Sequence, residues 1–467
     1  MQLLALRGQL ERVVEHVRYL VKDRHEKPNL KLYSALLLGH IDPAHGSVEG
    51  MLKLLAEMKE HGIAPDAGAY HNILKVLAVH PDYLVRDQIL DDMRRRWFEL
   101  NSDGWHDLVV GLLRDRNLEL AKEKLEHMQR EGMKVQTWLY DTFTYVLLGR
   151  EEIDEAMAML KYRIVEEGGA ISANVWYALL DTASRCYHYA GTVYAWRKEV
   201  EPNHVHPADG ICINVLNTAS RVGDCDLAMD VFRILGNRSF RFELNHYEAL
   251  LEAYLVNKDL KTALTILSIM KSAGLEPDEG TTRSLVRDLR QRRDRPAQAM
   301  GMLSTLHSEN RPIPTAAVNA IIEASIALDQ LDEGIQHYRA LHSLCSDGPN
   351  TSTFNTIFRG CTYARRKDLA LFHAAEMRAL KIQPSALTLD RLVLVCLQEP
   401  DYDDAFRYMG EMTARKWPLR PGTSMALIRR CVEARDERVW DLIARRGMDR
   451  VEADKLRAWV RAQWEQT

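Results

Sequence analysis

A small residue recurs at a nearly constant spacing along most of this chain, inside stretches with the hydrophobic pattern of amphipathic helices. The spacing is 35 or 36 residues, apart from one gap of about twice that length. The small residues are Ala121, Ala156, Ala228, Ala263, Ala299, Gly334, Ala370 and Ala405. Seven residues after each one, two turns along the same helical face, the chain carries Met or Leu in every case except Arg163. This period predicts a fold built from repeated units.

Many of these units end in a turn where Gly or Pro interrupts the helical pattern. Examples are Gly62–Asp66, Gly274–Asp278 and Lys381–Ser385. Gly provides a left-handed helix cap, and Pro prevents the helix from continuing. A further helical stretch, such as 247–254, lies between each turn and the next small residue. Each unit therefore reads as a helix, a turn and a second helix. Because one such pair cannot bury both of its faces, the units must stack, and the sequence predicts an all-α solenoid.

The order of a Tyr-x-x-Leu or Tyr-x-x-Ile start, a small residue, a Met and a Gly-x-x-Pro-Asp ending resembles the pentatricopeptide repeat. The best copies are Leu244–Asp278 and Thr351–Ser385, whereas those at Ala67, Ala173 and Glu279 are degenerate. The resemblance implies a right-handed superhelix of about eleven repeats of about 35 residues, spanning residues 30–422. We expect repeats to start near Leu30, Ala67, Ser102, Thr137, Ala173, Asp209, Leu244, Glu279, Thr315, Thr351 and Ala386.

Two further segments flank the predicted repeats. Residues 1–29 are expected to form a partial repeat or cap, because residues 6–29 read like the second helix of a unit. This half-unit has two explanations: sequence upstream of this numbering that includes a basic leader, or an atypical N-terminal cap. Residues 423–467 are expected to cap the other end, with helices at Met425–Arg446 and Val451–Trp464.

Composition and charge exclude several classes of protein. Lys and Arg number 62 and Asp and Glu 66, so the net charge of −4 argues against coating nucleic acid through bulk charge. The seven cysteines are widely spread and form no Cys-x-x-Cys pair, which argues against a disulfide framework or a structural zinc site. No apolar run reaches the ~18 residues that a membrane span needs.

The sequence also lacks the motifs of catalysis. It contains no Gly-x-x-x-x-Gly-Lys phosphate loop, no Gly-x-Ser-x-Gly elbow and no His-Glu-x-x-His pair. The acidic run at 401–404 follows Pro400 and opens a predicted helix, where carboxylates stabilise the helix N-terminus. We therefore predict that the chain is not an enzyme and needs no metal or cofactor.

The family resemblance implies that the partner is single-stranded RNA. In pentatricopeptide repeat proteins the fifth and last residues of a repeat select one base, and the second residue helps to hold it. Unstacked bases offer their Watson–Crick edges to such polar side chains. Three pairs fit the pattern: Ser34 with Asp66 resembles a guanine reader, Asn319 with Asn350 a pyrimidine reader, and Asn355 with Ser385 a cytosine reader. Other pairs depart from it, including the doubly acidic Glu248 with Asp278.

Cations near the turns between helices are candidates for phosphate contacts. Family members often carry Lys or Arg near the C-terminal end of the first helix, where this chain has Arg114, Arg185 and Arg221. The further candidates are Arg292, Arg293, Arg365, Arg366 and Lys367. A phosphate contact and a solvated inter-helix loop are both consistent with these residues.

Two functions follow from these observations. The first is an RNA-binding protein of mitochondrial gene expression that acts in transcript stability, processing or translation. The second is a protein-interaction scaffold, such as a component or assembly factor of the mitochondrial ribosome. The repeat pattern favours the first, whereas the acidic balance and the many fifth residues outside the pattern favour the second. Location in the mitochondrial matrix is an expectation from the family resemblance.

Overall fold

The computed structural model describes residues 1–466 except 167, 169 and 446–449. Every regular element within these residues is a helix, and the helices form successive helix–turn–helix pairs. The predicted all-α solenoid architecture is thus confirmed. The chain divides into two compact parts, here called the N-terminal part (Met1–Pro207) and the C-terminal part (Ala208–Thr467).

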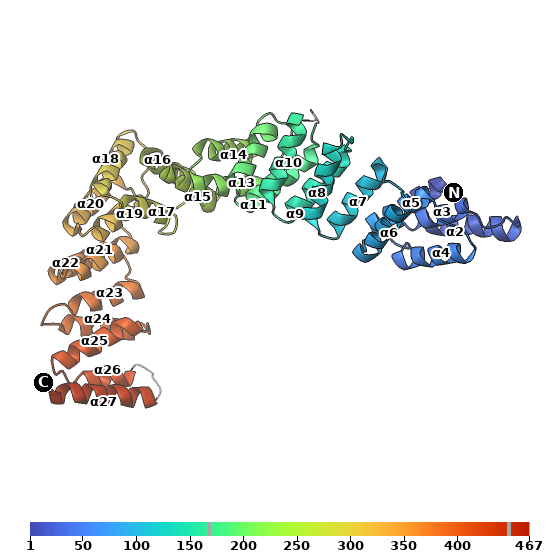
Figure 1. Cartoon of the computed structure of the whole chain (residues 1–467). Helices are drawn as coiled ribbons and strands as arrows, with labels where there is room; N and C mark the ends of the chain where they lie inside the picture. Colours follow the sequence, from blue (N-terminus) through green and yellow to red (C-terminus); the bar gives the residue numbers. More distant parts are fainter. Residues whose placement is uncertain (167, 169, 446–449, 467) are drawn as a thin grey trace. The chain divides into compact units, whose positions relative to one another are not determined.

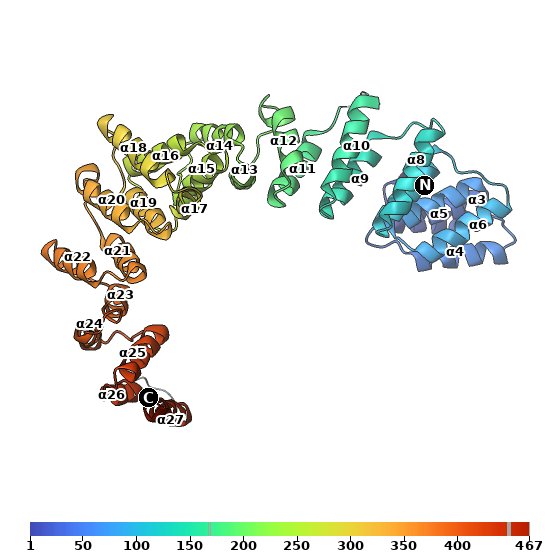
Figure 2. The ribbon, with the colours of Figure 1, turned by 60° about the vertical axis from the view of Figure 1, so that its left-hand side comes forward.

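The N-terminal part begins with two short helices and continues as five helix pairs (Figure 1). Figure 2 shows the pairs α9/α10 and α11/α12 next to each other. The helices are α1 (Gln2–Leu6), α2 (Leu10–Arg18), the π-helix η1 (Tyr19–Asp23), α3 (Leu30–Gly39), α4 (Val48–Glu60), α5 (Ala67–Val79), α6 (Tyr83–Arg95), α7 (Ser102–Arg114), α8 (Leu118–Arg130), α9 (Thr137–Gly149), α10 (Ile153–Glu166), α11 (Ala173–Arg185), α12 (Tyr189–Ala195) and the π-helix η2 (Trp196–Val200).

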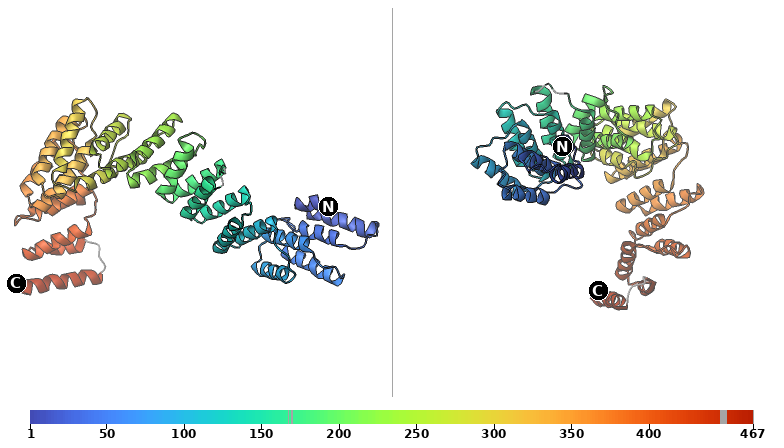
Figure 3. Two further views of the ribbon diagram at one scale, coloured as in Figure 1. Left: turned by 45° about the horizontal axis from the view of Figure 1, so that its top comes forward. Right: turned by 90° about the vertical axis from the view of Figure 1, so that its right-hand side faces the viewer.

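The C-terminal part continues the same alternation of first and second helices. In Figure 3 the orange to red helices α21 to α27 follow one another in a stack. The helices are α13 (Asp209–Val222), α14 (Cys225–Asn237), α15 (Leu244–Val256), α16 (Leu260–Ser272), α17 (Arg283–Leu289), α18 (Arg295–Ser308), α19 (Thr315–Ala327), α20 (Leu331–Leu344), α21 (Thr351–Ala364), α22 (Lys367–Ala379), α23 (Ala386–Cys396), α24 (Asp403–Ala414), α25 (Pro421–Glu433), α26 (Val439–Arg445) and α27 (Arg450–Gln466).

The first helices, which carry the odd numbers from α3 to α25, begin where polar residues cap them. Ten of the eleven expected repeat starts coincide with a helix start, from Leu30 of α3 to Ala386 of α23. The preceding residue often accepts a hydrogen bond from the first turn of the helix, as N-cap side chains do. Residues with this role include Asn29, Asp66, Asn101, Asn350 and Ser385. The last residue of a predicted repeat is therefore often the N-cap of the next one.

The repeat expected to start at Glu279 differs, because its first helix α17 begins only at Arg283. Residues 279–282 form turns instead. Asp278 accepts hydrogen bonds from the backbone N–H and the hydroxyl of Thr281, at 2.9 and 3.1 Å. Such local side-chain bonds compete with the helix, and Gly280 disfavours it further. The expected start at Glu279 was thus wrong by about one helical turn.

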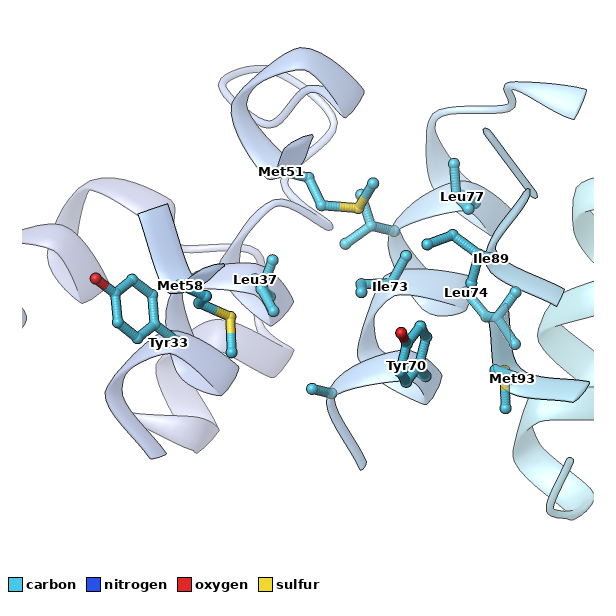
Figure 4. Packing of buried hydrophobic residues seen from close by; sticks show 12 residues of the cluster. Tyr33, Leu37, Met51, Met58, Tyr70, Ile73, Leu74, Leu77, Ile89 and Met93 are labelled. Carbon is cyan, nitrogen blue, oxygen red and sulfur yellow. The ribbon is translucent and has the colours of Figure 1, made fainter. Parts of the chain in front are cut away.

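The small residues of the period lie in the cores of the two parts, as the sequence predicts. All seven alanines of the series are fully buried, and the Met and Leu residues seven positions later are buried with them. Figure 4 shows the equivalent packing at the start of the chain, where Met51 and Met58 of α4 lie near Leu37 of α3. The exception, Arg163, is also buried, and its guanidinium group pairs with Asp141. Its charge is thus compensated inside the stack.

The end expected to form one helix over Met425–Arg446 forms two, α25 and α26. Arg435 adopts a left-handed φ of 53°, and Asp436 binds both Arg438 and the Tyr402 hydroxyl, the latter at 2.7 Å. These contacts end α25 and start a new helix. Arg446 lies outside the described residues. At the other end, residues 6–29, expected to read as one second helix, hold α2 and the π-helix η1, which end at Asp23, and the short helix α1 packs against α3.

Candidate functional site

The first helices of each part pack against one another, and their second, fifth, sixth and ninth residues form a surface that we call the inner face. Many fifth residues on it bind the start of the next repeat. The Nε2 atom of His71 accepts the N–H of Asn101 at 3.1 Å, and that of His106 accepts the N–H of Gln136 at 2.9 Å. The Nδ1 atoms face carbonyl oxygens of their own helices at 2.7 and 2.6 Å. Each ring thus accepts at Nε2, donates from Nδ1 and links neighbouring repeats.

The predicted guanine-reading residues, Ser34 and Asp66, form hydrogen bonds with other residues and not with each other. The Ser34 hydroxyl accepts a hydrogen bond from the Asn72 amide at 2.8 Å. The Asp66 carboxylate accepts the backbone N–H of Ala69, also at 2.8 Å, and caps α5. Each side chain thus has a structural partner, and a base would have to use the hydrogen-bonding capacity that remains. The assignment as a guanine reader stays a prediction.

The predicted pyrimidine-reading pair is in direct contact. The Asn319 amide nitrogen donates to the Asn350 side-chain oxygen at 3.2 Å, and the Asn319 oxygen accepts from the Thr353 hydroxyl at 2.7 Å. Thr353 and Asn350 also form a capping box at the start of α21. The fifth and last residues of this repeat are therefore joined across the boundary to the next repeat. Asn319 keeps one N–H and one lone pair for a ligand.

The predicted cytosine-reading pair contains the most unusual group of the inner face. Asn355 is only 7% exposed, and its side-chain oxygen has no hydrogen-bond partner among the described residues. A buried acceptor without a donor costs about 1–3 kcal/mol of folding free energy. Ser385 instead forms a capping box with Thr388 at the start of α23. Among the three predicted pairs, Asn355 thus contributes the one buried acceptor that lacks a donor within the described part of the chain.

A hollow of about 180 Å³ opens on the inner face between the segment at 277–282 and helices α19 and α21. It is lined by the residues that the family resemblance assigns to base contact, including Asn319, Asn350 and the second residues Ala316 and Ser352. Three carboxylates also border it, those of Asp278, Glu279 and Glu323. The small second residues leave space beside the amides instead of closing it.

Among the predicted phosphate contacts, those of the N-terminal part have protein partners. Arg114 donates to the carbonyl oxygen of Ala78 in the preceding repeat. Arg185 forms an exposed ion pair with Glu151 at 3.3 Å. In the C-terminal part, Arg221 is exposed at the end of α13. Exposed ion pairs contribute at most about 1 kcal/mol, so Arg185 can exchange its partner at low cost.

The remaining predicted phosphate contacts differ in exposure. Arg293 and Arg365 are exposed, and neither forms an ion pair with another described residue. Arg292 pairs with Asp294 at 2.6 Å and Arg366 with Asp368 at 3.0 Å, all at the surface.

Lys367, in contrast, is only 6% exposed. Its ammonium group pairs with Asp404 at 3.3 Å and donates to the Asp401 carbonyl at 2.6 Å. The placement of Lys367 at a phosphate was therefore wrong: it joins two repeats.

Three arginines that the sequence reasoning missed lie on or next to the inner face around Asn355. Arg359 is the ninth residue of α21 and binds Glu323 at 2.9 Å. Arg391 is the sixth residue of α23 and donates to the backbone carbonyl oxygen of Asn355. The backbone N–H of Arg420 binds Asp390, the fifth residue of α23, at 3.4 Å. Burial and the neighbouring guanidinium groups of Arg359 and Arg420 lower the pKa of Arg391. A list of sixth and ninth residues of the first helices would have found Arg359 and Arg391.

Chemistry other than hydrogen bonding and charge is not indicated by the described residues. Among them no group of three or more His, Cys, Asp or Glu side chains is arranged to hold a metal ion. None of the described helices is both long enough and apolar enough to cross a membrane. The site is therefore characterised by its amides, hydroxyls, guanidinium groups and carboxylates.

Comparison with known families identifies the repeats. A family model described as "Pentatricopeptide repeat-containing protein" matches residues 209–341, which span α13 to α20. The repeats of residues 209–341 therefore match the pentatricopeptide repeat family. This confirms, from the C-terminal part, the family resemblance that the residue pattern suggested.

Solved structures of other helical-repeat proteins align with nearly the whole chain at low identity. The pentatricopeptide repeat protein PPR10 from maize is 17% identical, with 98% of this chain and 73% of that chain covered and a TM-score of 0.35. Yeast Rmd9p, solved with a 16-nucleotide target RNA, is 11% identical, with 95% and 88% covered and a TM-score of 0.35. No curated protein sequence matches this chain.

Proposed function

We propose that the chain binds single-stranded RNA on the inner face of α19, α21 and α23. The observation that carries the proposal is the buried side-chain oxygen of Asn355, which lacks a hydrogen-bond donor among the described residues. Arg391 binds the backbone carbonyl of the same residue, and Arg359 lies near enough to Arg391 to lower its pKa. Once a rotation of the Asn355 side chain exposes that oxygen, a base can donate a hydrogen bond to it while the cations contact the phosphodiester backbone. The pentatricopeptide repeats at 209–341 include α19 and support the same conclusion.

The base contacts follow from the hydrogen-bonding groups that remain open. An acceptor at Asn355 fits the amino group of cytosine or the N3–H of uracil, and Asn319 with Asn350 offers a further donor and acceptor beside the hollow. We infer that these two neighbouring repeats face two consecutive pyrimidines, the second preferably cytosine. The carboxylates of Asp278 and Glu279 border the hollow and disfavour a phosphate there, and Glu279 also acts on Arg391. We therefore infer that the backbone passes closer to the exposed Arg420.

The test is a binding titration of the full chain with two labelled RNAs of equal length. One has consecutive pyrimidines, and the other is an unstructured purine-rich strand. Asn355→Ala should weaken binding of the pyrimidine-rich strand by about 1 kcal/mol, about fivefold, and leave the other strand nearly unchanged. Replacing both Arg365 and Arg366 by Ala should weaken both strands equally and reduce the salt dependence. If all variants bind both strands like the parent at low salt, this face is not an RNA site.

We further propose that the RNA is a mitochondrial transcript and that binding serves its stability, processing or translation. Support comes only from the family to which the repeats belong. Crosslinking in intact cells, followed by sequencing of the bound RNA and fractionation of the organelles, tests both the location and the transcript. Recovery of the chain outside mitochondria, with no enriched organellar RNA, would contradict this proposal.

A second function, as a protein-interaction scaffold of the mitochondrial ribosome or its assembly, is favoured by a different observation. Fifth residues such as His71, His106 and Asn319 are used to link repeats, which limits the number of bases that can be read. The same crosslinking experiment distinguishes the two functions. Recovery of one ribosomal protein in fixed proportion, without a specific RNA footprint, would favour the scaffold.

A further inference from the structure

The inner face of α9 and α11 in the N-terminal part exposes aromatic rings. Trp138 is the second residue of α9 and Tyr145 the ninth, while Tyr177 is the fifth residue of α11. Their exposed fractions are 47%, 42% and 37%. Large aromatic side chains are usually buried for most of their surface, and several exposed on neighbouring helices are typical of an interaction surface.

The packing of the first helices brings these rings onto one surface. Helices α7, α9 and α11 pack against one another in sequence order. The ring of His106 on α7 lies 5.7 Å, centroid to centroid, from that of Trp138, and His106 also accepts the N–H of Gln136 just before α9. The three exposed rings therefore stand on the adjacent helices α9 and α11, and His106 links α7 to the start of α9. This surface is largely formed before a partner binds.

Carboxylates occupy other positions of the same inner face. Asp103 and Asp107 are the second and sixth residues of α7, and Asp181 is the ninth residue of α11. Asp141 on α9 is neutralised by Arg163, and the ammonium group of Lys75 on α5 acts on Asp107. The remaining excess of negative charge is unfavourable for a phosphodiester backbone.

Exposed aromatic rings interspersed with carboxylates fit a cationic ligand. A guanidinium group stacks on the face of Trp or Tyr and at the same time donates hydrogen bonds to a carboxylate, which an ammonium group does less well. We propose that the inner face of α7, α9 and α11 is a docking surface for an arginine-rich segment of a partner protein. This site is separate from the proposed RNA site and does not depend on it.

The test uses the full chain and a fluorescein-labelled octa-arginine peptide, with binding followed by fluorescence anisotropy at low ionic strength. Trp138→Ala should weaken peptide binding about tenfold, and the double variant Asp103→Asn/Asp181→Asn by a similar factor. The matched controls lie away from the inner face. Trp97→Ala removes a Trp that is 92% exposed after α6, and Glu119→Gln/Glu126→Gln removes two charges from α8. Both controls should change the affinity less than twofold.

Each alternative gives a different outcome. If the α8 control weakens binding as much as the inner-face carboxylate variant, the peptide senses only overall charge and the proposal is overturned. If Trp138→Ala weakens binding of oligouridine RNA but not of octa-arginine, the surface stacks bases and the proposal is equally overturned. Circular dichroism checks the fold of each variant, and Tyr177→Ala replaces Trp138→Ala should the latter unfold. An octa-lysine peptide should bind several-fold more weakly than octa-arginine.

Discussion

The inner faces of the two parts use the same scaffold for opposite chemistry. Around α21 and α23 the inner face carries amides, carboxylates such as Glu323 and Asp390, and the guanidinium groups of Arg359 and Arg391. Around α7 to α11 it carries exposed rings and carboxylates. In both parts the alanines of the period are buried to the same extent. The repeat thus determines which positions form the inner face but not which residue types occupy them. The two inner faces can therefore have different functions.

The largest effect is expected from charge reversal near α23, which should weaken RNA binding and leave peptide binding at α7 to α11 unchanged. The double variant Arg391→Glu/Arg420→Glu should weaken binding of pyrimidine-rich RNA about a hundredfold at low salt, because two phosphate contacts are replaced by repulsion. Octa-arginine binding to the N-terminal part should stay unchanged. The control Arg94→Glu/Arg95→Glu changes the same charge at the end of α6. An equal loss of RNA affinity in that control would show that bulk charge alone is responsible.

Enlarging a buried alanine of the period should lower the unfolding free energy by a similar amount in the two parts. Ala263→Leu and Ala121→Leu each insert a larger side chain where the native one is fully buried between paired helices. Overpacking should cost about 1–3 kcal/mol of unfolding free energy at either site. Denaturant unfolding measures the loss. Unchanged stability in both variants would mean that the period does not mark the close approach of helices.

Two asparagines at the same position of neighbouring repeats should behave differently on the inner face of α19 and α21. Asn319→Leu breaks the bonds to Asn350 and Thr353 and should destabilise the chain by about 1–3 kcal/mol. Asn355→Leu removes an acceptor that lacks a donor and should leave stability unchanged or raise it, while RNA affinity falls. Thermal unfolding and RNA titration of both variants are the measurements. Equal destabilisation by the two variants would show that Asn355 has a structural partner after all.

The smallest effect is expected in the pH dependence of binding, which should be stronger for the octa-arginine peptide than for RNA. Burial, with the nearby Asp103, raises the pKa of Asp107 to about 6, above its ordinary value of 3.8 and against the effect of Lys75. Asp107 is thus charged at pH 7 and neutral at pH 5, so octa-arginine affinity should fall a few-fold over this range. Arg359, Arg391 and Arg420 keep their charge over the same pH range. RNA binding should therefore lose less affinity than peptide binding does.

The same shift has a consequence for folding. Because the folded chain binds this proton more tightly than the unfolded chain, the contribution of Asp107 to stability is present at low pH and is lost as pH rises through 6. In Asp107→Asn this pH-dependent contribution should disappear. Unfolding experiments at pH 5 and pH 7 compare the two chains.

Much of the fold was predictable from the sequence, because helix periodicity and caps are local signals. Ten helix starts, including Leu30 and Ala386, follow from the repeat and its turn residues. The start of α17 was missed, because hydrogen bonds that Thr281 donates to the Asp278 carboxylate displace the helix start by a turn. The break between α25 and α26 was missed too, since it depends on the contact of Asp436 with the distant Tyr402.

The candidate site was predictable only in part. The contact of Asn319 with Asn350 agrees with their pairing by the repeat pattern. The burial of Lys367 was not predictable, because its partner Asp404 belongs to the next repeat and an isolated Lys-Asp pattern does not identify it. Arg391 was missed because the family's recognition pattern does not include the sixth residue, although this residue lies beside the fifth.

Hydrogen exchange of the full chain, with and without a pyrimidine-rich single-stranded RNA, shows directly where RNA binds. Amides that become part of the RNA interface exchange more slowly. We expect RNA to slow amide exchange in α19, α21 and α23 and to leave it unchanged in α7, α9 and α11. Protection confined to α7–α11, or no protection anywhere at RNA concentrations that saturate binding, would contradict it.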